Sequence, residues 1–180
     1  MKLIILDRDG TINHDSDDYI KSPEEWRPLP GAPEAIARLN QAGYRVAVAT
    51  NQSGIGRGLY DMATLNAMHE KMHRVVNAAG GRIDAIFFCP HVPDDQCACR
   101  KPLPGMLEDI GRRFGVDLRS VAMVGDTIHD IEAAAAVGAQ PILVRTGKGE
   151  RTLNRFGADN IKGGVQIFDD LAAVAQSLAP

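Results

Sequence analysis

Two aspartates one residue apart, Asp7 and Asp9, follow directly on a run of four apolar residues. This run, residues 3–6, does not alternate with polar side chains, which is typical of a strand buried on both faces. A carboxylate just beyond such a strand lies at the edge where open α/β sheets bind ligands. One carboxylate there can attack phosphorus, while the other, when protonated, donates to the leaving oxygen and later activates water. The plainer alternative is an acidic turn, because Asp-Gly is a common turn dipeptide.

Thr50 and the amides after it, Asn51 and Gln52, follow a second expected strand at residues 44–49. Hydroxyl and amide groups are neutral donors, which bind phosphate oxygens without repelling a metal. A divalent cation would in turn offset the repulsion between Asp7 and a phosphate. These groups extend the expected phosphate site, although Thr and Asn also begin ordinary turns.

All three cysteines of the chain fall within one loop together with a histidine, as Cys89, His91, Cys97 and Cys99. Four thiolate and imidazole ligands are the set for a closed tetrahedral Zn²⁺ site, which leaves no open position and is therefore structural. The alternatives are a disulfide or inert thiols, but three cysteines cannot all pair.

Two cations, Arg100 and Lys101, come directly after the last cysteine. A loop braced by a metal fixes such side chains better than a free loop does. Arg100 carries a planar fork of donors suited to bidentate recognition of phosphate or hydroxyl groups. A solvated basic pair is the alternative.

Three other features, a histidine pair, a single histidine and a glycine-rich segment, are given no catalytic or metal-binding role. His69 and His73 share a helix face but have no third ligand nearby, so surface positions are expected. His129 is expected in solvent. The glycines of residues 54–58 lack the spacing of a dinucleotide site and are expected to let the backbone approach a sugar phosphate.

The elements that must position these residues alternate along the chain. Strands are expected at residues 3–6, 44–49, 83–88, 121–124 and 140–144, and helices at 33–42, 62–79, 105–114, 131–137 and 169–178. The expected fold class is α/β, a Rossmann-like, doubly wound, mainly parallel sheet with helices on both faces. The polar segment 12–25 is too short for a cap domain, and one zinc-bearing loop is the only expected addition.

Length, composition and net charge bear on the number of domains, the binding of nucleic acid or membranes, and the cellular compartment. A chain of 180 residues, 44% hydrophobic and 24% charged, is expected to form one soluble domain over residues 1–180. The net charge of −3 gives no electrostatic basis for binding nucleic acid or an anionic membrane. No apolar run approaches the roughly 20 residues of a membrane span, and the first residues lack a signal-peptide pattern. We expect a cytoplasmic protein, and a monomer.

The motifs resemble those of the haloacid dehalogenase superfamily, in order along the chain. The matching residues are Asp7-x-Asp9-Gly10-Thr11, Thr50, Lys101 and Asp126-x-x-x-Asp130. The resemblance implies that Asp7 is the nucleophile of a phosphatase and Asp9 its general acid and base. It also implies Mg²⁺ bound by the Asp7 carboxylate, the Asp9 backbone carbonyl and Asp126, with Asp130 just outside the ligand set. Thr50 and Lys101 would hold the phosphoryl group.

The junction of zinc loop and lysine, residues 97–102, is similar to the histidinol-phosphate phosphatase-like subfamily, and within it to heptose bisphosphate phosphatases. This implies hydrolysis of the C7 phosphate of D-glycero-D-manno-heptose 1,7-bisphosphate through a phospho-aspartate, giving heptose 1-phosphate for nucleotide-activated heptose of the lipopolysaccharide core. The residues that would contact this phosphorylated sugar are Arg8, Asp15, Asp18, Tyr19, Asn51, Gln52, Ser53, Arg100 and Thr127. Thr127 stands where other members carry Lys, which bears on recognition of the second phosphate.

Two other functions stay open. A histidinol-phosphate phosphatase of histidine biosynthesis would share every catalytic residue and differ only in the leaving group. A zinc-stabilised, non-catalytic binding module is the remote alternative, and the complete set of motifs argues against it.

Overall fold

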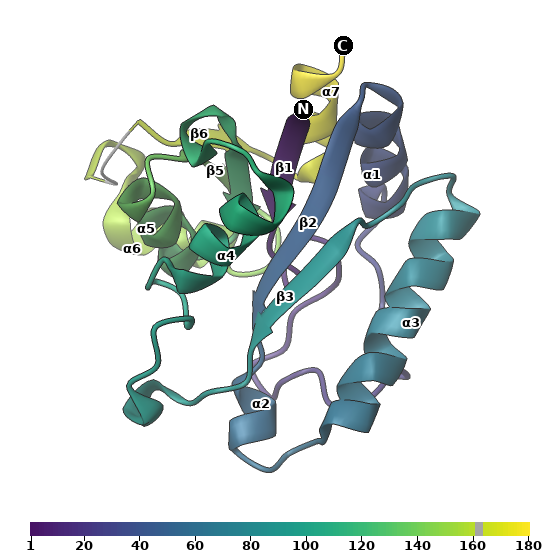
Figure 1. Ribbon diagram of the computed structural model, residues 1–180, viewed down its shortest axis with the longest axis vertical. Helices are drawn as coiled ribbons and strands as arrows, with labels where there is room; N and C mark the ends of the chain where they lie inside the picture. The colour runs from purple at the N-terminus through teal and green to yellow at the C-terminus, as the bar shows by residue number, and fades with distance from the viewer. Residues whose placement is uncertain (161–163) are drawn as a thin grey trace.

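A computed structural model describes residues 1–160 and 164–180, and its strands form one parallel sheet in the order β3-β2-β1-β4-β5-β6 (Figure 1). The strands are β1 Lys2–Leu6, β2 Tyr44–Asn51, β3 Ala85–Cys89, β4 Ala122–Gly125, β5 Gln140–Val144 and β6 Gln166–Phe168. The chain builds outward from β1 to β3, returns to the other side of β1, and continues from β4 to β6. The order therefore reverses between β1 and β4, where doubly wound sheets bind ligands.

Helices cover both faces of this sheet (Figure 1). On one face lie α1 Ala32–Gln41, α3 Met62–Ala78 and α7 Leu171–Leu178, and on the other lie α4 Gly105–Phe114, α5 Ile128–Ala136 and α6 Gly149–Phe156. Short segments complete the list: α2 Ser53–Gly56 and the 3-10 turns Pro93–Asp95, Leu118–Ser120 and Ala158–Asn160.

The apolar run of β1 contributes to two cores. Ile4 and Leu6 pack in the core beneath α1, α3 and α7, whereas Leu3 and Ile5 pack in the core beneath α4 and α5. Because successive side chains of a strand point to opposite faces, a strand covered on both sides is apolar throughout. The expected fold class is confirmed.

Register brings three strand ends together. Leu6 of β1 pairs with Val48 of β2 on one side and with Val124 of β4 on the other. Parallel strands in this register end at the same edge, so the residues that follow β1, β2 and β4 meet there.

Three elements were not expected, namely α2, α6 and β6. Strand β6 has three residues at the sheet edge, and α6 offers few apolar positions, so neither produces a clear period. Helix α5 begins at Ile128, three residues before its expected start. Its first turn is capped because Asp130 Oδ2 accepts hydrogen bonds from the backbone N–H and the hydroxyl of Thr127.

The segment between β1 and α1, residues 7–31, contains turns and isolated bridges without a helix or regular strand. It is held against α3, where the Lys71 ammonium donates to the carbonyls of Pro23 and Trp26, both at 2.7 Å. The buried Trp26 side chain anchors it further. No helix in the described part of the chain has the length and apolar content needed to cross a membrane.

Candidate active site

Asp7 and Asp9 lie beyond the end of β1 and both line one cavity of about 340 Å³. The turn after them depends on Gly10, whose φ of 83° lies in the left-handed region. A Cβ at this position would also lie 2.0 Å from Oδ2 of Asp126. Gly10 therefore lets the turn after β1 lie directly against the carboxylate that follows β4.

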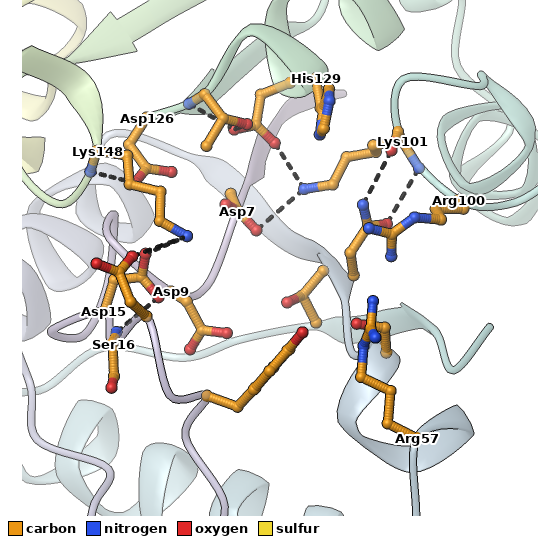
Figure 2. A pocket seen from close by; sticks show the side chains of 17 residues that line it. Asp7, Asp9, Asp15, Ser16, Arg57, Arg100, Lys101, Asp126, His129 and Lys148 are labelled. Atoms are coloured by element: carbon orange, nitrogen blue, oxygen red, sulfur yellow. Dashed lines mark hydrogen bonds and ion pairs between the residues drawn. The ribbon is translucent and has the colours of Figure 1, made fainter. Parts of the chain in front are cut away.

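Lys101 enters this cavity from the loop between β3 and α4 (Figure 2). Its ammonium lies 3.0 Å from Asp7 Oδ1 and 2.6 Å from Asp130 Oδ1, and it donates to the Ala49 carbonyl at 2.7 Å. The backbone of Lys101 is held in turn by Asn51, whose amide pairs with its N–H and its carbonyl, both at 3.0 Å. A cation is thus fixed between two buried carboxylates.

Three carboxylates, those of Asp7, Asp126 and Asp130, lie within 4.8 Å of one another. Burial, followed by the charges of Asp130 and Asp9, raises the pKa of Asp7 to about 7. Burial, followed by the charges of Asp7 and Asp130, raises the pKa of Asp126 well above its ordinary value. The ionised forms are therefore unfavourable here without an added cation.

The same carboxylates fit a hard divalent cation. Asp126 Oδ1 is buried and has no hydrogen-bond partner, whereas its Oδ2 accepts from the Lys148 N–H at 2.7 Å. Asp130 differs, because Lys101 occupies one of its oxygens and Thr127 the other. Oxygen donors of this kind suit Mg²⁺, with Asp7 and Asp126 as the available carboxylates.

The four residues of the cysteine loop also come together. Cys89 Sγ lies 3.7 Å from Cys97 Sγ and 3.2 Å from Cys99 Sγ, and His91 Nδ1 lies 3.4 Å from Cys89 Sγ and 3.3 Å from Cys99 Sγ. A tetrahedral zinc site with Zn–S bonds of about 2.3 Å places its ligand atoms roughly 3.5–3.8 Å apart. The loop therefore brings a soft ligand set close to the dimensions of such a site.

The cavity walls carry charges of both signs (Figure 2). Arg57 and Arg100 lie on one side and Lys148 on the opposite side, where its ammonium pairs with Asp15 at 3.1 Å. The Arg57 guanidinium also stacks over the Tyr19 ring at 5.6 Å. Such a polar cavity suits a phosphorylated, hydroxyl-rich ligand better than an apolar one.

Most of the expected sugar contacts reach this cavity, and three do not. Those that line it are Asp15, Tyr19, Asn51, Ser53, Arg100 and Thr127. Asp18 lines a neighbouring hollow instead. Gln52 is buried and donates to Asp9 at 3.0 Å and to the Thr50 hydroxyl at 2.8 Å. Arg8 is 0% exposed, so the expectation that it touches substrate is corrected: it lies in the turn after β1, and its side chain is buried in the protein.

Several interpretations of single residues change. His69 was expected at the surface, but it is 8% exposed and lies against the Arg8 guanidinium. A Cβ on Gly54 would meet the Tyr60 ring at 2.2 Å, and one on Gly56 would meet the Pro90 carbonyl at 2.6 Å. These glycines therefore permit close packing within the protein and are not explained by an approaching ligand.

Five further residues line the cavity, namely Ser16, Asp17, Arg57, His129 and Lys148, and His129 had been expected in solvent. Lys148 follows β5 between two glycines, so the rule that strand ends carry the site would have identified it. Asp17 and Arg57 come from loops, and nothing in their local sequence indicates where they point.

Comparison with known proteins identifies the family to which this chain belongs. A model of the haloacid dehalogenase-like hydrolases matches residues 13–138, and the chain belongs to that family. D-glycero-beta-D-manno-heptose-1,7-bisphosphate 7-phosphatase of Bordetella bronchiseptica is 59% identical over 178 residues, covering 99% of this chain and 98% of the relative. Its counterpart from Pseudomonas aeruginosa is 60% identical over 176 residues, covering 98% and 97%.

A solved structure agrees with these relatives. The D,D-heptose 1,7-bisphosphate phosphatase from B. bronchiseptica, complexed with magnesium and phosphate, matches with a TM-score of 0.96 at 59% identity, covering 99% of this chain and 98% of that one. The family expected from the motifs is confirmed, and with it the expectation of a hydrolase.

Proposed function

We propose that this chain is a Mg²⁺-dependent phosphatase that hydrolyses the C7 phosphate of D-glycero-D-manno-heptose 1,7-bisphosphate, with the β anomer following the relatives' names. The observation that carries the proposal is the cluster of Asp7, Lys101 and Asp126 in a cavity lined by further cations. Relatives named for this activity match nearly the whole chain, which supports the same substrate here.

In this proposal Asp7 attacks phosphorus. The bond between phosphorus and the C7 oxygen breaks, and Asp9 transfers its proton to that oxygen, which leaves as the sugar hydroxyl. Asp9, now ionised, takes a proton from a water that attacks the same phosphorus. Phosphate departs, and the Asp7 carboxylate is restored. Thr50 and Lys101 donate hydrogen bonds to phosphoryl oxygens as charge develops on them.

The Asp7 carboxylate and Asp126 would hold Mg²⁺, together with the backbone carbonyl of Asp9. When bound, the ion supplies positive charge that offsets the repulsion between carboxylate and phosphate. The paired oxygens of Asp130 support its assignment to holding Lys101 rather than the ion.

The second phosphate of the substrate needs a cation away from Asp7. Arg100 offers a planar fork, and Arg57 lies on the same side of the cavity (Figure 2). Lys148, on the opposite side of the cavity, is already paired with Asp15. We therefore assign the second phosphate to the side that carries the two arginines.

We further propose a structural Zn²⁺ on Cys89, His91, Cys97 and Cys99, and a monomer that acts in the cytoplasm. The described residues of one chain supply every group assigned above, which supports function as a monomer. Cys89, Cys97 and Cys99 form no disulfide with one another, and cysteines that serve as zinc ligands suit a reducing compartment.

The test is phosphate release with Mg²⁺, comparing heptose 1,7-bisphosphate with histidinol phosphate at equal concentration. We expect a preference of about a hundredfold or more for the heptose, equivalent to about 2.7 kcal/mol of transition-state binding. Asp7→Asn should lower turnover by at least about 10³-fold, since an amide does not replace the nucleophile. Preference for histidinol phosphate would replace the proposed substrate, and full activity in Asp7→Asn would refute the mechanism.

A further inference from the structure

Arg8 is a charged side chain buried between the catalytic end of β1 and helix α3. Its guanidinium is bidentate on Asp9, with Nε donating to Oδ1 at 2.9 Å and Nη2 to Oδ2 at 3.1 Å. On its other side Nη1 lies 3.3 Å from Nε2 of His69. Because a buried guanidinium is costly unless its donors are paired, these contacts determine where it can lie.

The Asp9 carboxylate is also held by two amides. Asn13 donates to Oδ1 at 2.8 Å and Gln52 donates to Oδ2 at 3.0 Å. The Tyr60 hydroxyl donates to Oε1 of the Gln52 side chain and so fixes the amide that contacts Asp9. Both oxygens of Asp9 therefore accept hydrogen bonds from protein groups, and among the described residues Arg8 is the one side chain that donates to both.

His69 must accept the hydrogen bond from Arg8, because a guanidinium has only donors. Its ring is therefore neutral, with the proton on Nδ1. Burial, followed by the charge of Arg8, lowers the pKa of His69 to about 3, in agreement with this assignment. Helix α3 thus places a fixed acceptor at the far end of the guanidinium.

We propose that His69 and Arg8 are positioning residues for Asp9. The inference rests on the proposed phosphatase function, in which Asp9 gives its proton to the leaving oxygen. Neither side chain lines the cavity, so both act through Asp9. His69 fixes Nη1, which fixes the plane of the guanidinium and hence the direction of the Asp9 carboxylate.

The leaving group separates this role from a merely structural one. General acid catalysis contributes about 10²–10⁴-fold when the departing oxygen needs a proton. An alkyl oxygen of a sugar needs one, whereas p-nitrophenolate departs as a stable anion. A displaced Asp9 should therefore slow transfer from a sugar phosphate much more than transfer from p-nitrophenyl phosphate.

The experiment compares kcat/KM for heptose 1,7-bisphosphate and p-nitrophenyl phosphate, with Mg²⁺, in His69→Leu and His69→Gln. Leu removes the acceptor, so we expect a loss of about tenfold or more on the sugar phosphate and less than about threefold on the aryl phosphate. Gln keeps an acceptor oxygen and should restore most of the sugar activity. His73→Leu, one turn further along α3, is the matched control and should leave the ratio unchanged.

Arg8→Lys is the second variant, which keeps the charge but loses the fork that joins Asp9 to His69. It should change the ratio in the same direction. Equal losses on both substrates, or an unchanged ratio in active variants, would overturn the inference and leave the proposed function standing. Wild-type protein inactive on both substrates would refute the proposed function and the inference with it.

Discussion

At the scale of single residues, a buried lysine joins two of the carboxylates of the site. Lys101 is 2% exposed and contacts Asp7 and Asp130 with the same ammonium. Burial alone lowers the pKa of a lysine, but the carboxylates of Asp130 and Asp7 raise the pKa of Lys101 above its ordinary value. Lys101 is therefore charged in the folded protein and partly compensates the acids around it.

Removing this charge should destabilise the protein. In Lys101→Met, two carboxylates lose their partner inside the fold, which costs about 3–5 kcal/mol for a broken buried pair. Urea unfolding at neutral pH without Mg²⁺ measures the loss. Arg119→Met is the control, because its pair with Asp117 is exposed to solvent and its loss should leave the free energy of unfolding nearly unchanged. Equal effects of the two substitutions would contradict this account of Lys101.

At the scale of elements, the loop between β3 and α4 connects the proposed zinc site to Lys101. One end carries the cysteines, and the other is fixed by Asn51 at the end of β2. The loop also lies tightly on the start of α4, where a Cβ on Gly105 would be 2.3 Å from the Ala98 carbonyl. The position of Lys101 therefore depends on the conformation of the whole loop.

Disrupting the zinc site should affect both stability and turnover. In Cys99→Ser we expect loss of most bound zinc, a melting temperature lower by roughly 5–10 °C, about 2–3 kcal/mol at this chain length, and reduced kcat because Lys101 is displaced. Metal analysis, thermal unfolding and kinetics measure these three effects. Asp94→Asn, an exposed substitution in the same loop, should change none of them. Unaltered turnover in a zinc-depleted Cys99→Ser protein would show that catalysis does not depend on the zinc in this loop.

At the scale of the whole molecule, the parallel sheet collects acidic residues at one edge. Asp7 follows β1 and Asp126 follows β4, and these strands are neighbours. The fold therefore forces together groups that repel one another, and the proposed Mg²⁺ would offset this repulsion. Folding as one domain over residues 1–180 stays a prediction, which a single cooperative unfolding transition would support.

The stabilisation by Mg²⁺ should depend on pH in a defined direction. The pKa of Asp7 rises from 3.8 to about 7 on folding, so metal-free protein loses stability as the pH rises through this window. Mg²⁺ binds the ionised carboxylates, and its stabilising effect should therefore grow over the same window. Thermal unfolding with and without Mg²⁺ at about pH 5 and about pH 8 measures the difference. An equal increase in melting temperature at both values would contradict the raised pKa of Asp7.

The sequence by itself determined the features that depend on local covalent geometry. An apolar run without alternation predicts a strand covered on both faces, and residues after parallel strands share one edge. The spacing of Asp7 and Asp9 predicts that both side chains lie on the same side of the backbone just beyond the end of β1. Both line the same cavity. Cys89, the last residue of β3, and His91, Cys97 and Cys99 in the loop after it lie close together in the sequence, so the spacing alone predicted that they would meet.

Only the tertiary structure decided which side chains meet across long distances in sequence. Arg8 contacts His69, 61 residues away, because α3 packs on the face of the sheet opposite the one covered by α4 and α5. Lys101 meets Asp7 across 94 residues because a loop from β3 returns over the end of β1. Whether a polar residue near the site faces the ligand or the core depends on such packing, and local spacing carries no information about it.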